Sequence, residues 1–439
     1  MFVGRTQELA YLDEMYREDG SRTIVVYGRR RVGKTALANE FLKGKEGVYF
    51  LAQKTKGQPQ RLTDKFAKDY NIYPPRTDTF EEAFSFITRS VRGRFVIVID
   101  EFPYLVEEDG SIPSQFQYII DEILAGTGIF LILQGSSIAM MENEVLAYKS
   151  PLYGRRDGQI KLSPFKIEEI FSLFPRKTME EIIEIYGVFG AVPAYLTLLD
   201  PQKNIYSNIA EQILVKERFL YEEAEFLLRQ ELREPIKYKE ILRTISNGKV
   251  RLSHIGDEVG IKPNVLTKYM ESLLTLGILR KVHPFGEKAF KRNTIYEFDD
   301  NYLRFYFRFI YPHIPMIEEG KQKVLLEEIR RGLPQYLGKV FEDVCRAYLT
   351  RFYTKVGPYW NKDVEIDAVA IGDTTALVEC KYKEVDGDKE TERLKAKRCP
   401  FTPDEYLVMA KGFLKGTGID LKRMRSEFTG SGGDERIHH

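Results

Sequence analysis

A glycine-rich segment at residues 23–36 carries the residue types that bind phosphate. It reads TIVVYGRRRVGKTA, so four residues separate Gly28 from Gly33, Lys34 and Thr35. An apolar run precedes the glycines and a helical pattern follows them, which is the context that a phosphate-binding loop requires. The glycines let backbone N–H groups surround phosphate oxygens, and the start of the helix favours negative charge. The segment therefore predicts binding of a nucleoside triphosphate.

The side chains of this loop have distinct expected roles. Lys34 supplies a positive charge to the β- and γ-phosphates, and the Thr35 hydroxyl coordinates Mg²⁺. The alternative is a glycine-rich turn that matches by accident, and it leaves the flanking strand and helix unexplained. The expected ATP-binding positions of the loop are Gly28, Arg29, Arg30, Arg31, Val32, Gly33, Lys34, Thr35 and Ala36.

Two carboxylates end a second apolar run, FVIVIDE at residues 95–101. A continuous apolar run is typical of a buried parallel strand whose C-terminal end faces the ligand. Asp100 is expected to hold Mg²⁺ through water, and Glu101 to polarise the attacking water. A helix cap is the alternative for this pair. A third run, residues 129–134, leads to Ser136, which either contacts the γ-phosphate or is a turn residue.

A second group of carboxylates lies in VEIDAVAIGDTTALVECKY, residues 364–382. Two strand-like runs flank a short turn, which predicts a β-hairpin. With the turn centred on Asp373, Asp367 lies directly opposite Glu379. Opposed side chains in a hairpin have Cβ atoms about 5 Å apart, and like charges there are destabilising. The pair therefore calls for a metal ion or an unusual proton.

The chemistry that suits these residues is metal-assisted phosphodiester hydrolysis. Asp367 and Glu379 would hold Mg²⁺, while Lys381 would position or help to deprotonate water and stabilise charge on phosphate. Glu342, on a predicted helix upstream, either reaches the same metal or pairs with Arg346 four residues on. A solvated edge of charged residues is the alternative for the whole hairpin.

Composition bounds the protein class. A chain of 439 residues predicts two to four domains. The formal net charge of +1 excludes a global basic field, so DNA binding would need local patches. Three cysteines are too few and too scattered for a disulfide framework or a zinc site. Without a signal peptide or an apolar span of about eighteen residues, the expected location is the cytoplasm, with no membrane partner.

The element pattern changes several times along the chain. Strands and helices alternate at first, which predicts an α/β domain with a parallel sheet. A helix, a turn, a longer helix and two strands then predict a winged helix. The expected domains are 1–165, the ATPase core; 166–233, a helical lid; 234–300, the winged helix; 301–335, a helical connector; 336–428, a nuclease-like α/β domain; and 429–439, a disordered tail.

Two of these segments leave alternatives open. The second helix of the winged helix either reads DNA or mediates protein contacts. This helix is expected over residues 263–276. Because the exposed positions include only Lys262 and Lys268 as cations, with Glu271 among them, protein contact is favoured. In residues 302–311, aromatic residues alternate with arginines. They either stack on bases or form a helix packed between domains, which is favoured.

The ATP-binding segments together resemble a known family. GRRRVGKT, FVIVIDE, the Gly4-Arg5 start with Glu8, and GAVPAYL resemble the archaeal and bacterial STAND-type AAA+ ATPases. The resemblance implies that Gly4, Arg5 and Pro193 contact the nucleotide. It also implies that a basic residue near residue 155 senses the γ-phosphate, and an arginine finger is one form that this role takes. The candidates for that residue are Arg155 and Arg156.

The C-terminal residues resemble a second family. Glu342, Asp367 and Glu379-Cys380-Lys381 resemble the PD-(D/E)XK nucleases, and the domain order resembles archaeal ATPases that end in a DUF234-type domain. The expected function is an ATP-binding and hydrolysing switch coupled to Mg²⁺-dependent DNA cleavage, with self-association in the ATP state. The alternative is an ATP-dependent regulatory or signalling scaffold whose inactive nuclease fold only binds DNA or protein.

Overall fold

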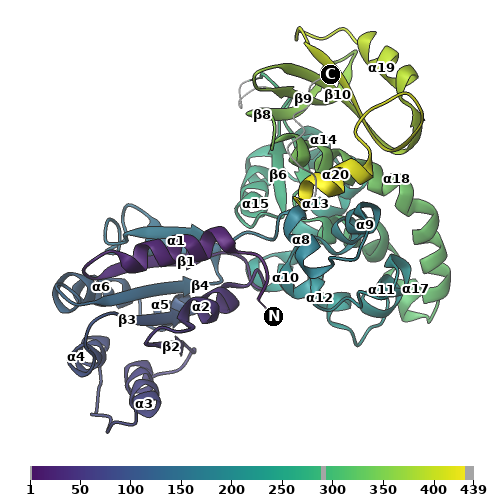
Figure 1. Ribbon diagram of the computed structural model, residues 1–439. Coiled ribbons are helices and arrows are strands. Elements are labelled where there is room, and N and C mark those ends of the chain that lie inside the picture. Colours follow the sequence, from purple (N-terminus) through teal and green to yellow (C-terminus); the bar gives the residue numbers. More distant parts are fainter. Residues whose placement is uncertain (1, 288–292, 431–439) are drawn as a thin grey trace. The chain divides into compact units, whose positions relative to one another are not determined.

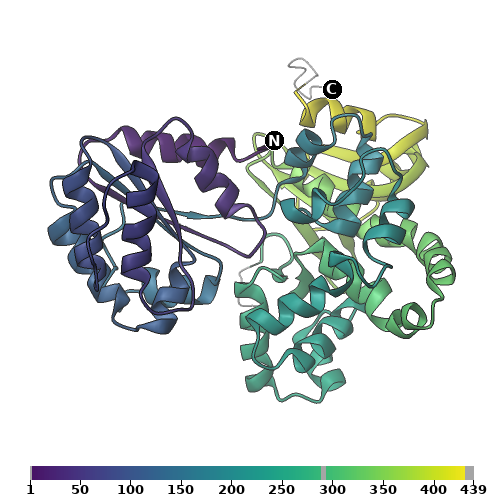
Figure 2. The same cartoon turned by 90° about the horizontal axis from the view of Figure 1, so that it is seen from below.

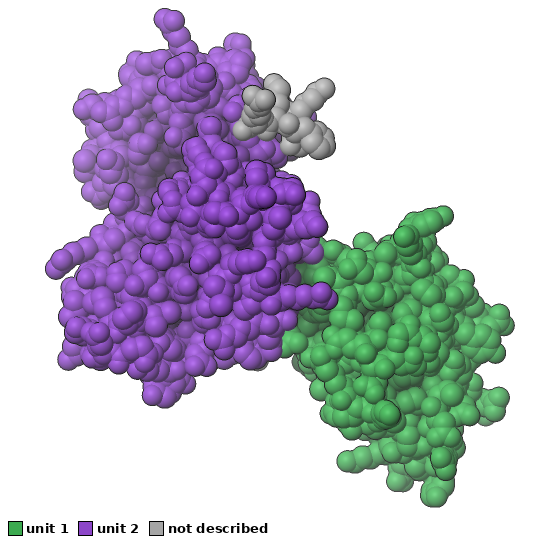
Figure 3. All heavy atoms as spheres, turned by 180° about the vertical axis from the view of Figure 1, so that it is seen from behind, with its two compact units in different colours: residues 1–164 green, residues 165–439 purple. Residues whose placement is uncertain are grey.

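The computed structural model describes residues 2–287 and 293–430. The chain forms two compact units, unit 1 from Met1 to Pro164 and unit 2 from Phe165 to His439 (Figure 3). Most of the predicted disordered tail, residues 431–439, lies outside the described residues.

Unit 1 is built on a five-stranded sheet in the order β2-β3-β4-β1-β5. Every neighbouring pair of strands is parallel, which confirms the predicted parallel α/β sheet. The three apolar runs singled out in the sequence form β1, β3 and β4. The strands are β1 (Arg22–Tyr27), β2 (Gly47–Leu51), β3 (Phe95–Asp100), β4 (Ile129–Gly135) and β5 (Gly158–Lys161).

Helices cover both faces of this sheet (Figures 1 and 2). Successive strand residues point to opposite faces, so each strand contributes to two cores. Ile24 packs in one core with Leu12 and Phe41, whereas Val25 packs in the other with Phe84. The helices are α1 (Thr6–Arg17), α2 (Lys34–Leu42), α3 (Gln58–Tyr70), α4 (Phe80–Ser90), α5 (Phe102–Glu108), α6 (Ile112–Tyr118) and α7 (Ile138–Met140), with π-helical turns η1 (Ile119–Ile123) and η2 (Met141–Leu146).

The strand register brings the functional candidates of unit 1 to one edge. Tyr27 of β1 pairs with Gly135 of β4, and Leu51 of β2 pairs with Asp100 of β3. Parallel strands end on the same side of a sheet, so the segments that follow β1, β3 and β4 emerge together. The phosphate loop and the residues after β3 and β4 therefore share this edge.

Unit 2 begins with helices and has one large core. Most of its buried apolar residues, from Phe165 to Phe428, belong to a single cluster, and two smaller clusters lie beside the C-terminal strands. The helices before the C-terminal sheet are α8 (Ile167–Leu173), α9 (Met179–Phe189), α10 (Pro193–Leu196), α11 (Ile205–Gln212), α12 (Phe219–Glu231), α13 (Pro235–Ser246), α14 (Leu252–Val259), α15 (Pro263–Thr275), α16 (Asn301–Phe305) and α17 (Ile314–Glu318).

The segment with the predicted winged-helix pattern contains helices α13, α14 and α15 followed by a two-stranded hairpin. In that hairpin β6 (Leu279–Val282) runs antiparallel to β7 (Ile295–Phe298). The aromatic segment after it forms α16, a π-helical turn η3 (Tyr306–Ile310) and a short η4 (Tyr311–His313). Tyr302, Phe305 and Phe307 are fully buried, so these rings pack in the core and are not available to stack on bases.

The C-terminal sheet has four strands in the order β11-β10-β9-β8. Pairing of Ala368 with Val378 and of Ile371 with Thr375 confirms the predicted hairpin register. Helix α18 (Gln322–Leu349) packs on this sheet and is continuous across the predicted 335/336 boundary. The proposed division of unit 2 into smaller domains stays a prediction. The remaining elements are β8 (Lys355–Trp360), β9 (Glu365–Ile371), β10 (Thr375–Asp386), α19 (Gly387–Lys395), β11 (Glu405–Lys415) and α20 (Leu421–Phe428).

Candidate functional site

The phosphate loop connects β1 to α2 and depends on its glycines. A Cβ at Gly28 would lie 2.2 Å from the main-chain oxygen of Leu162, so no larger residue fits there without a backbone shift. Arg31 and Gly33 adopt positive φ values of 70° and 98°, which turn the chain tightly into the helix. The N-cap residue of α2 is Gly33, which has no side chain to accept hydrogen bonds from the first amides of the helix, and such amides are suited to bind an anion.

Lys34 lies across the mouth of this loop. Its Nζ donates hydrogen bonds to the main-chain oxygens of Gly28 at 2.9 Å and Arg29 at 2.8 Å. Lys34 is only 5% exposed. Because a buried charge needs hydrogen-bond partners, these two main-chain oxygens compensate for its burial. The loop therefore holds a cation close to the amides that would surround a phosphate.

Thr35 and Asp100 come together from different elements. The Thr35 hydroxyl donates to Asp100 Oδ2 at 3.0 Å, and the Tyr49 hydroxyl also donates to that oxygen. Gln134 Nε2 donates to the other oxygen, Oδ1, at 2.7 Å. A hydroxyl and a carboxylate are oxygen ligands of the kind that Mg²⁺ prefers. These two side chains fit the predicted metal site, and Tyr49 and Gln134 are neighbours that the sequence did not reveal.

Glu101 has an unusual backbone conformation and a fixed side chain. Its φ of 53° is left-handed, which is uncommon for a residue other than glycine. Ser136 Oγ donates to Glu101 Oε1 at 2.5 Å, and the Ser136 amide donates to Oε2 at 3.3 Å. Ser136 is thus directed at the predicted catalytic carboxylate.

Arg5 ties the N-terminal segment to the phosphate loop. Its Nη2 donates to the main-chain oxygens of Val32 at 2.9 Å and Ser163 at 2.5 Å, and Nη1 pairs with Glu8 at 3.3 Å. Gly4 and Arg5 both have positive φ values. Pro193, in contrast, begins α10 in unit 2. Contact of Gly4, Arg5 and Pro193 with a nucleotide stays a prediction.

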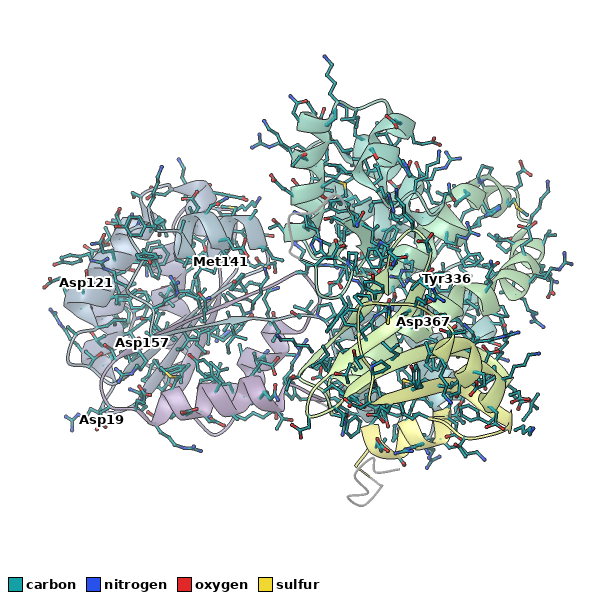
Figure 4. The ribbon with its side chains drawn as sticks, turned by 90° about the horizontal axis from the view of Figure 1, so that it is seen from above. Asp19, Asp121, Met141, Asp157, Tyr336 and Asp367 are labelled. Carbon is teal, nitrogen blue, oxygen red and sulfur yellow. The ribbon has the colours of Figure 1, made fainter. Side chains whose placement is uncertain are left out.

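The two candidate arginine sensors have different environments. Arg155 Nε donates to Asp121 Oδ2 at 2.7 Å, and Figure 4 labels Asp121 in unit 1. Arg156 Nη1 is buried, and among the described residues it has no hydrogen-bond partner. Its guanidinium lies 5.8 Å from the ring centre of Tyr153. An arginine that is not already committed to a carboxylate is better able to bind an added anion.

The second group of carboxylates lies on the β9–β10 hairpin. Asp367, labelled in Figure 4, accepts a hydrogen bond from the Cys380 amide at 2.7 Å. Glu379 Oε1 accepts from Lys381 at 2.5 Å, and its Oε2 accepts from Lys397 at 2.6 Å. The sequence singled out Lys381 but missed Lys397. The latter follows α19, eighteen residues beyond Glu379, and no local pattern marks it.

The surroundings of the two carboxylates shift their pKa values in opposite directions. Burial, together with the negative charges of Glu379 and Glu342, raises the pKa of Asp367 to about 6. Burial would also raise the pKa of Glu379, but hydrogen bonds from Lys381 and Lys397 lower it below its usual value. Asp367 is therefore the more basic of the pair, and Glu379 stays ionised.

Glu342 is engaged by cations on its own helix. Its Oε2 lies 2.8 Å from Lys339 Nζ and 3.6 Å from Arg346 Nη1. Within residues 2–287 and 293–430, no three His, Cys, Asp or Glu side chains are clustered as metal ligands. A metal site built from Asp367, Glu379 and Glu342 therefore stays a prediction.

Two protein families and two archaeal proteins match this chain over part or most of its length. Residues 2–199 match the family described as an ATPase domain predominantly from Archaea, and residues 306–394 match a family of archaeal and bacterial proteins of unknown function. Uncharacterized protein MJECL04 of Methanocaldococcus jannaschii is 35% identical over 399 residues, covering 88% of each chain. Uncharacterized ATP-binding protein MJ0423 of that organism is 48% identical over 46 residues, or 10% of this chain and 78% of its own.

Among solved structures, the Walker-type ATPase paby2304 of Pyrococcus abyssi has the same kind of fold. It superimposes with a TM-score of 0.52 at 20% identity, covering 70% of this chain and 96% of its own. Within the described residues, none of the helices has the length and apolar character needed to cross a membrane.

Proposed function

We propose, from the premise that this chain belongs to the same family as protein MJECL04 and carries an archaeal-type ATPase domain, that it is an ATP-dependent switch acting on a C-terminal nuclease-like domain. The observation that carries the ATPase half is the 3.0 Å contact between Thr35 and Asp100 beside the phosphate loop. The two side chains come from the loop helix and from the end of β3. That convergence supports a site for a nucleoside triphosphate and its Mg²⁺.

Each residue of this edge has a role in the proposed hydrolysis. Lys34 and the loop amides bind and orient the β- and γ-phosphates. Thr35 and Asp100 would hold Mg²⁺, which supplies charge neutralisation on the phosphate oxygens when bound. Glu101 orients the attacking water and accepts its proton, and Ser136 fixes the carboxylate for that task. Arg156 is the better candidate of the two arginines to meet the γ-phosphate, because Arg155 is paired with Asp121.

The nuclease-like half of the proposal rests on the β9–β10 hairpin. Asp367, Glu379 and Lys381 are the side chains that metal-assisted phosphodiester hydrolysis needs, and Glu342 lies close enough to raise the pKa of Asp367. Displacement of Lys397 or Lys381 from Glu379 would free an oxygen for Mg²⁺. In this proposal the winged-helix segment of α13–α15 and the β6–β7 hairpin relays the nucleotide state, and self-association accompanies ATP binding.

A regulatory scaffold without nuclease activity is the second candidate. The observation that favours it is the double lysine pairing of Glu379, which neutralises a proposed metal ligand. The near-neutral net charge also offers little general attraction for DNA. Under this alternative the C-terminal domain binds DNA or protein and cleaves neither. Both proposed functions include ATP hydrolysis by unit 1 and a cytoplasmic location.

Cleavage assays separate the two candidates. Single-stranded, duplex and branched DNA would be incubated with Mg²⁺ or Mn²⁺, with and without ATP, using wild type and the Lys34→Ala, Asp367→Ala and Asp363→Ala variants. Asp363 is an exposed carboxylate near the start of β9 and serves as the matched control. Cleavage that Asp367→Ala abolishes and ATP alters supports the nucleotide-gated nuclease. No cleavage with intact ATP hydrolysis supports the scaffold, and ATP hydrolysis by Lys34→Ala protein would overturn the loop assignment.

A further inference from the structure

Unit 2 contains a cavity that neither the ATPase nor the nuclease-like residues use. Its volume is about 360 Å³. The end of α13 and the turn after it form one side, β7 and η3 form another, and α18 closes the third. Ligand sites for small molecules are concave and start at about 300 Å³. The cavity is therefore large enough for a compact organic molecule.

Aromatic side chains form much of the cavity wall. Phe298, Phe309 and Tyr336 all line it, and Figure 4 labels Tyr336 in unit 2. The rings of Phe309 and Tyr336 meet edge to face with centres 5.5 Å apart. Gly332 keeps α18 close to this pair, since a Cβ there would lie 2.8 Å from Phe309 Cε1. Fixed rings of this kind suit a planar ligand.

Three cationic side chains line the same cavity, against one carboxylate, Glu297. Arg304 is occupied, because it donates to Asp343 at 3.2 Å and to the main-chain oxygen of Phe298 at 2.8 Å. Lys339 is shared between Glu297 at 3.4 Å and Glu342 at 2.8 Å. Two of the three cations are therefore already paired with carboxylates, which leaves Arg308 as the cation to consider.

Arg308 is the cation with spare binding capacity. It projects from η3, its side chain is exposed, and no hydrogen bond or ion pair to it is found among the described residues. A guanidinium presents two parallel N–H donors that match a carboxylate or a phosphate. Its position beside Phe309 puts this fork next to the aromatic wall.

We propose that the cavity binds a small organic anion that combines a planar ring with one carboxylate or phosphate group. The ring packs against Phe309 and Tyr336, and the anionic group is held by Arg308 with Lys339 nearby. Two features determine the ligand class. The aromatic wall selects a flat apolar body, and the guanidinium of Arg308 selects a negative charge. The proposal is independent of both candidate functions of the hairpin carboxylates.

Calorimetric titration with 1-naphthyl phosphate tests the proposal, with 1-naphthol as the uncharged probe. The proteins are the full chain as wild type, Arg308→Gln, Arg331→Gln and Lys34→Ala. Arg331 is the matched control, because it is an exposed arginine of α18 next to Gly332 that does not line the cavity. Lys34→Ala removes binding that takes place at the phosphate loop.

We expect one molecule of 1-naphthyl phosphate to bind wild type, Arg331→Gln and Lys34→Ala with equal affinity. Arg308→Gln should bind at least about tenfold more weakly, as expected when a hydrogen-bonded charge pair is lost, and 1-naphthol should bind as weakly as that. Three results overturn the proposal: no binding to wild type at millimolar probe, equal binding to Arg308→Gln, or binding that disappears in Lys34→Ala.

Discussion

Arg346 Nη1 donates a hydrogen bond to the main-chain oxygen of Asp367 at 2.9 Å, which joins helix α18 to strand β9 at the candidate nuclease-like site. The same guanidinium donates from Nη2 to Asp343 at 2.6 Å. Asp343 also accepts from Arg304 and Arg280, so one carboxylate holds three arginines from three elements. This carboxylate links the β6–β7 hairpin and α16 to the helix that supports Asp367.

Replacing Asp343 with Asn should destabilise unit 2 strongly. The Asp343 side chain is only 7% exposed, and the positive charges around it hold its pKa far below the usual value. Removing one partner of a buried ion pair leaves uncompensated charge, which typically costs about 3–5 kcal/mol. Urea unfolding would measure the loss. Asp363→Asn, at an exposed site, should change the free energy of unfolding by less than about 0.5 kcal/mol, and an equally small effect of Asp343→Asn would show that the cluster is not stabilising.

Glu184 on α9 should make unit 2 less stable at alkaline pH. Burial, followed by repulsion from Glu180 and Glu181, raises its pKa to about 7. The folded pKa lies above the unfolded one, so this contribution to stability is fully present below about pH 4.5 and is lost as pH rises through 7. Glu184→Gln removes the cost of burying an ionised carboxylate. It should raise the free energy of unfolding by about 1–2 kcal/mol at pH 8, after allowance for partial exposure.

The comparison for this pH effect is Glu240→Gln, at an exposed position of α13. Denaturation of wild type and both variants at pH 5 and pH 8 gives the test. The increase in the free energy of unfolding of Glu184→Gln over wild type should be smaller at pH 5 than at pH 8. Glu240→Gln should have the same free energy of unfolding as wild type at both pH values. A gain of equal size at pH 5 and pH 8 would contradict the assigned pKa.

Much of the ATPase edge could be predicted because its signals are local. Gly28, Lys34 and Thr35 lie in one loop and the first turn of the helix after it. Asp100 ends a strand whose apolar composition predicts burial, and Glu101 follows it directly. The hairpin register likewise followed from a turn centred on Asp373, since antiparallel pairing is symmetrical about its turn.

The parts that were missed depend on contacts between distant segments. Lys397 reaches Glu379 only because α19 returns beside the sheet, and Tyr49 reaches Asp100 across two adjacent strands. In the sequence, nothing distinguishes Asp343 from the other charged residues of an amphipathic helix. Its three arginines come from segments up to 63 residues away, so no spacing rule points to them.

Gly28→Ala should weaken both the fold of unit 1 and ATP binding. The added Cβ would lie 2.2 Å from the main-chain oxygen of Leu162, and a backbone atom cannot move aside as a side-chain tip can. Overpacking of this kind costs about 1–3 kcal/mol. Denaturant unfolding and ATP titration would measure the change. Gly110→Ala is the matched control, since a Cβ there meets no atom within 4 Å. Wild-type stability in Gly28→Ala would show that the loop tolerates a side chain.

Arg155→Ala and Arg156→Ala should have different effects on ATP turnover. Arg155 forms a partly exposed ion pair with Asp121, which is worth at most about 1 kcal/mol, so its loss should leave turnover within about twofold of wild type. If Arg156 is an arginine finger, its loss should lower turnover by about 10³-fold. Phosphate release assays measure both variants.

A mixing experiment tests whether Arg156 acts on a second copy of the chain. Arg156→Ala retains an intact Glu101, and Glu101→Gln retains an intact Arg156. If the arginine acts between copies, mixing these two inactive variants should restore part of the turnover. Equal turnover in Arg155→Ala and Arg156→Ala would contradict the assignment.

Glu101 and Ser136 provide the most direct test of the hydrolytic site. Glu101→Gln keeps the size of the side chain but removes the proton acceptor, so turnover should fall by about 10²–10⁴-fold while ATP affinity is retained.

Ser136→Ala removes the 2.5 Å hydrogen bond to Glu101 Oε1. Because a hydrogen bond to a charged group contributes about 1.5–3 kcal/mol, turnover should fall by about tenfold or more with KM unchanged. Ser137→Ala is the neighbouring control, since its hydroxyl caps α7 and does not contact Glu101. Faster turnover in Ser136→Ala would mean that the hydrogen bond holds Glu101 away from water, and Ser136 would then restrain the Glu101 carboxylate.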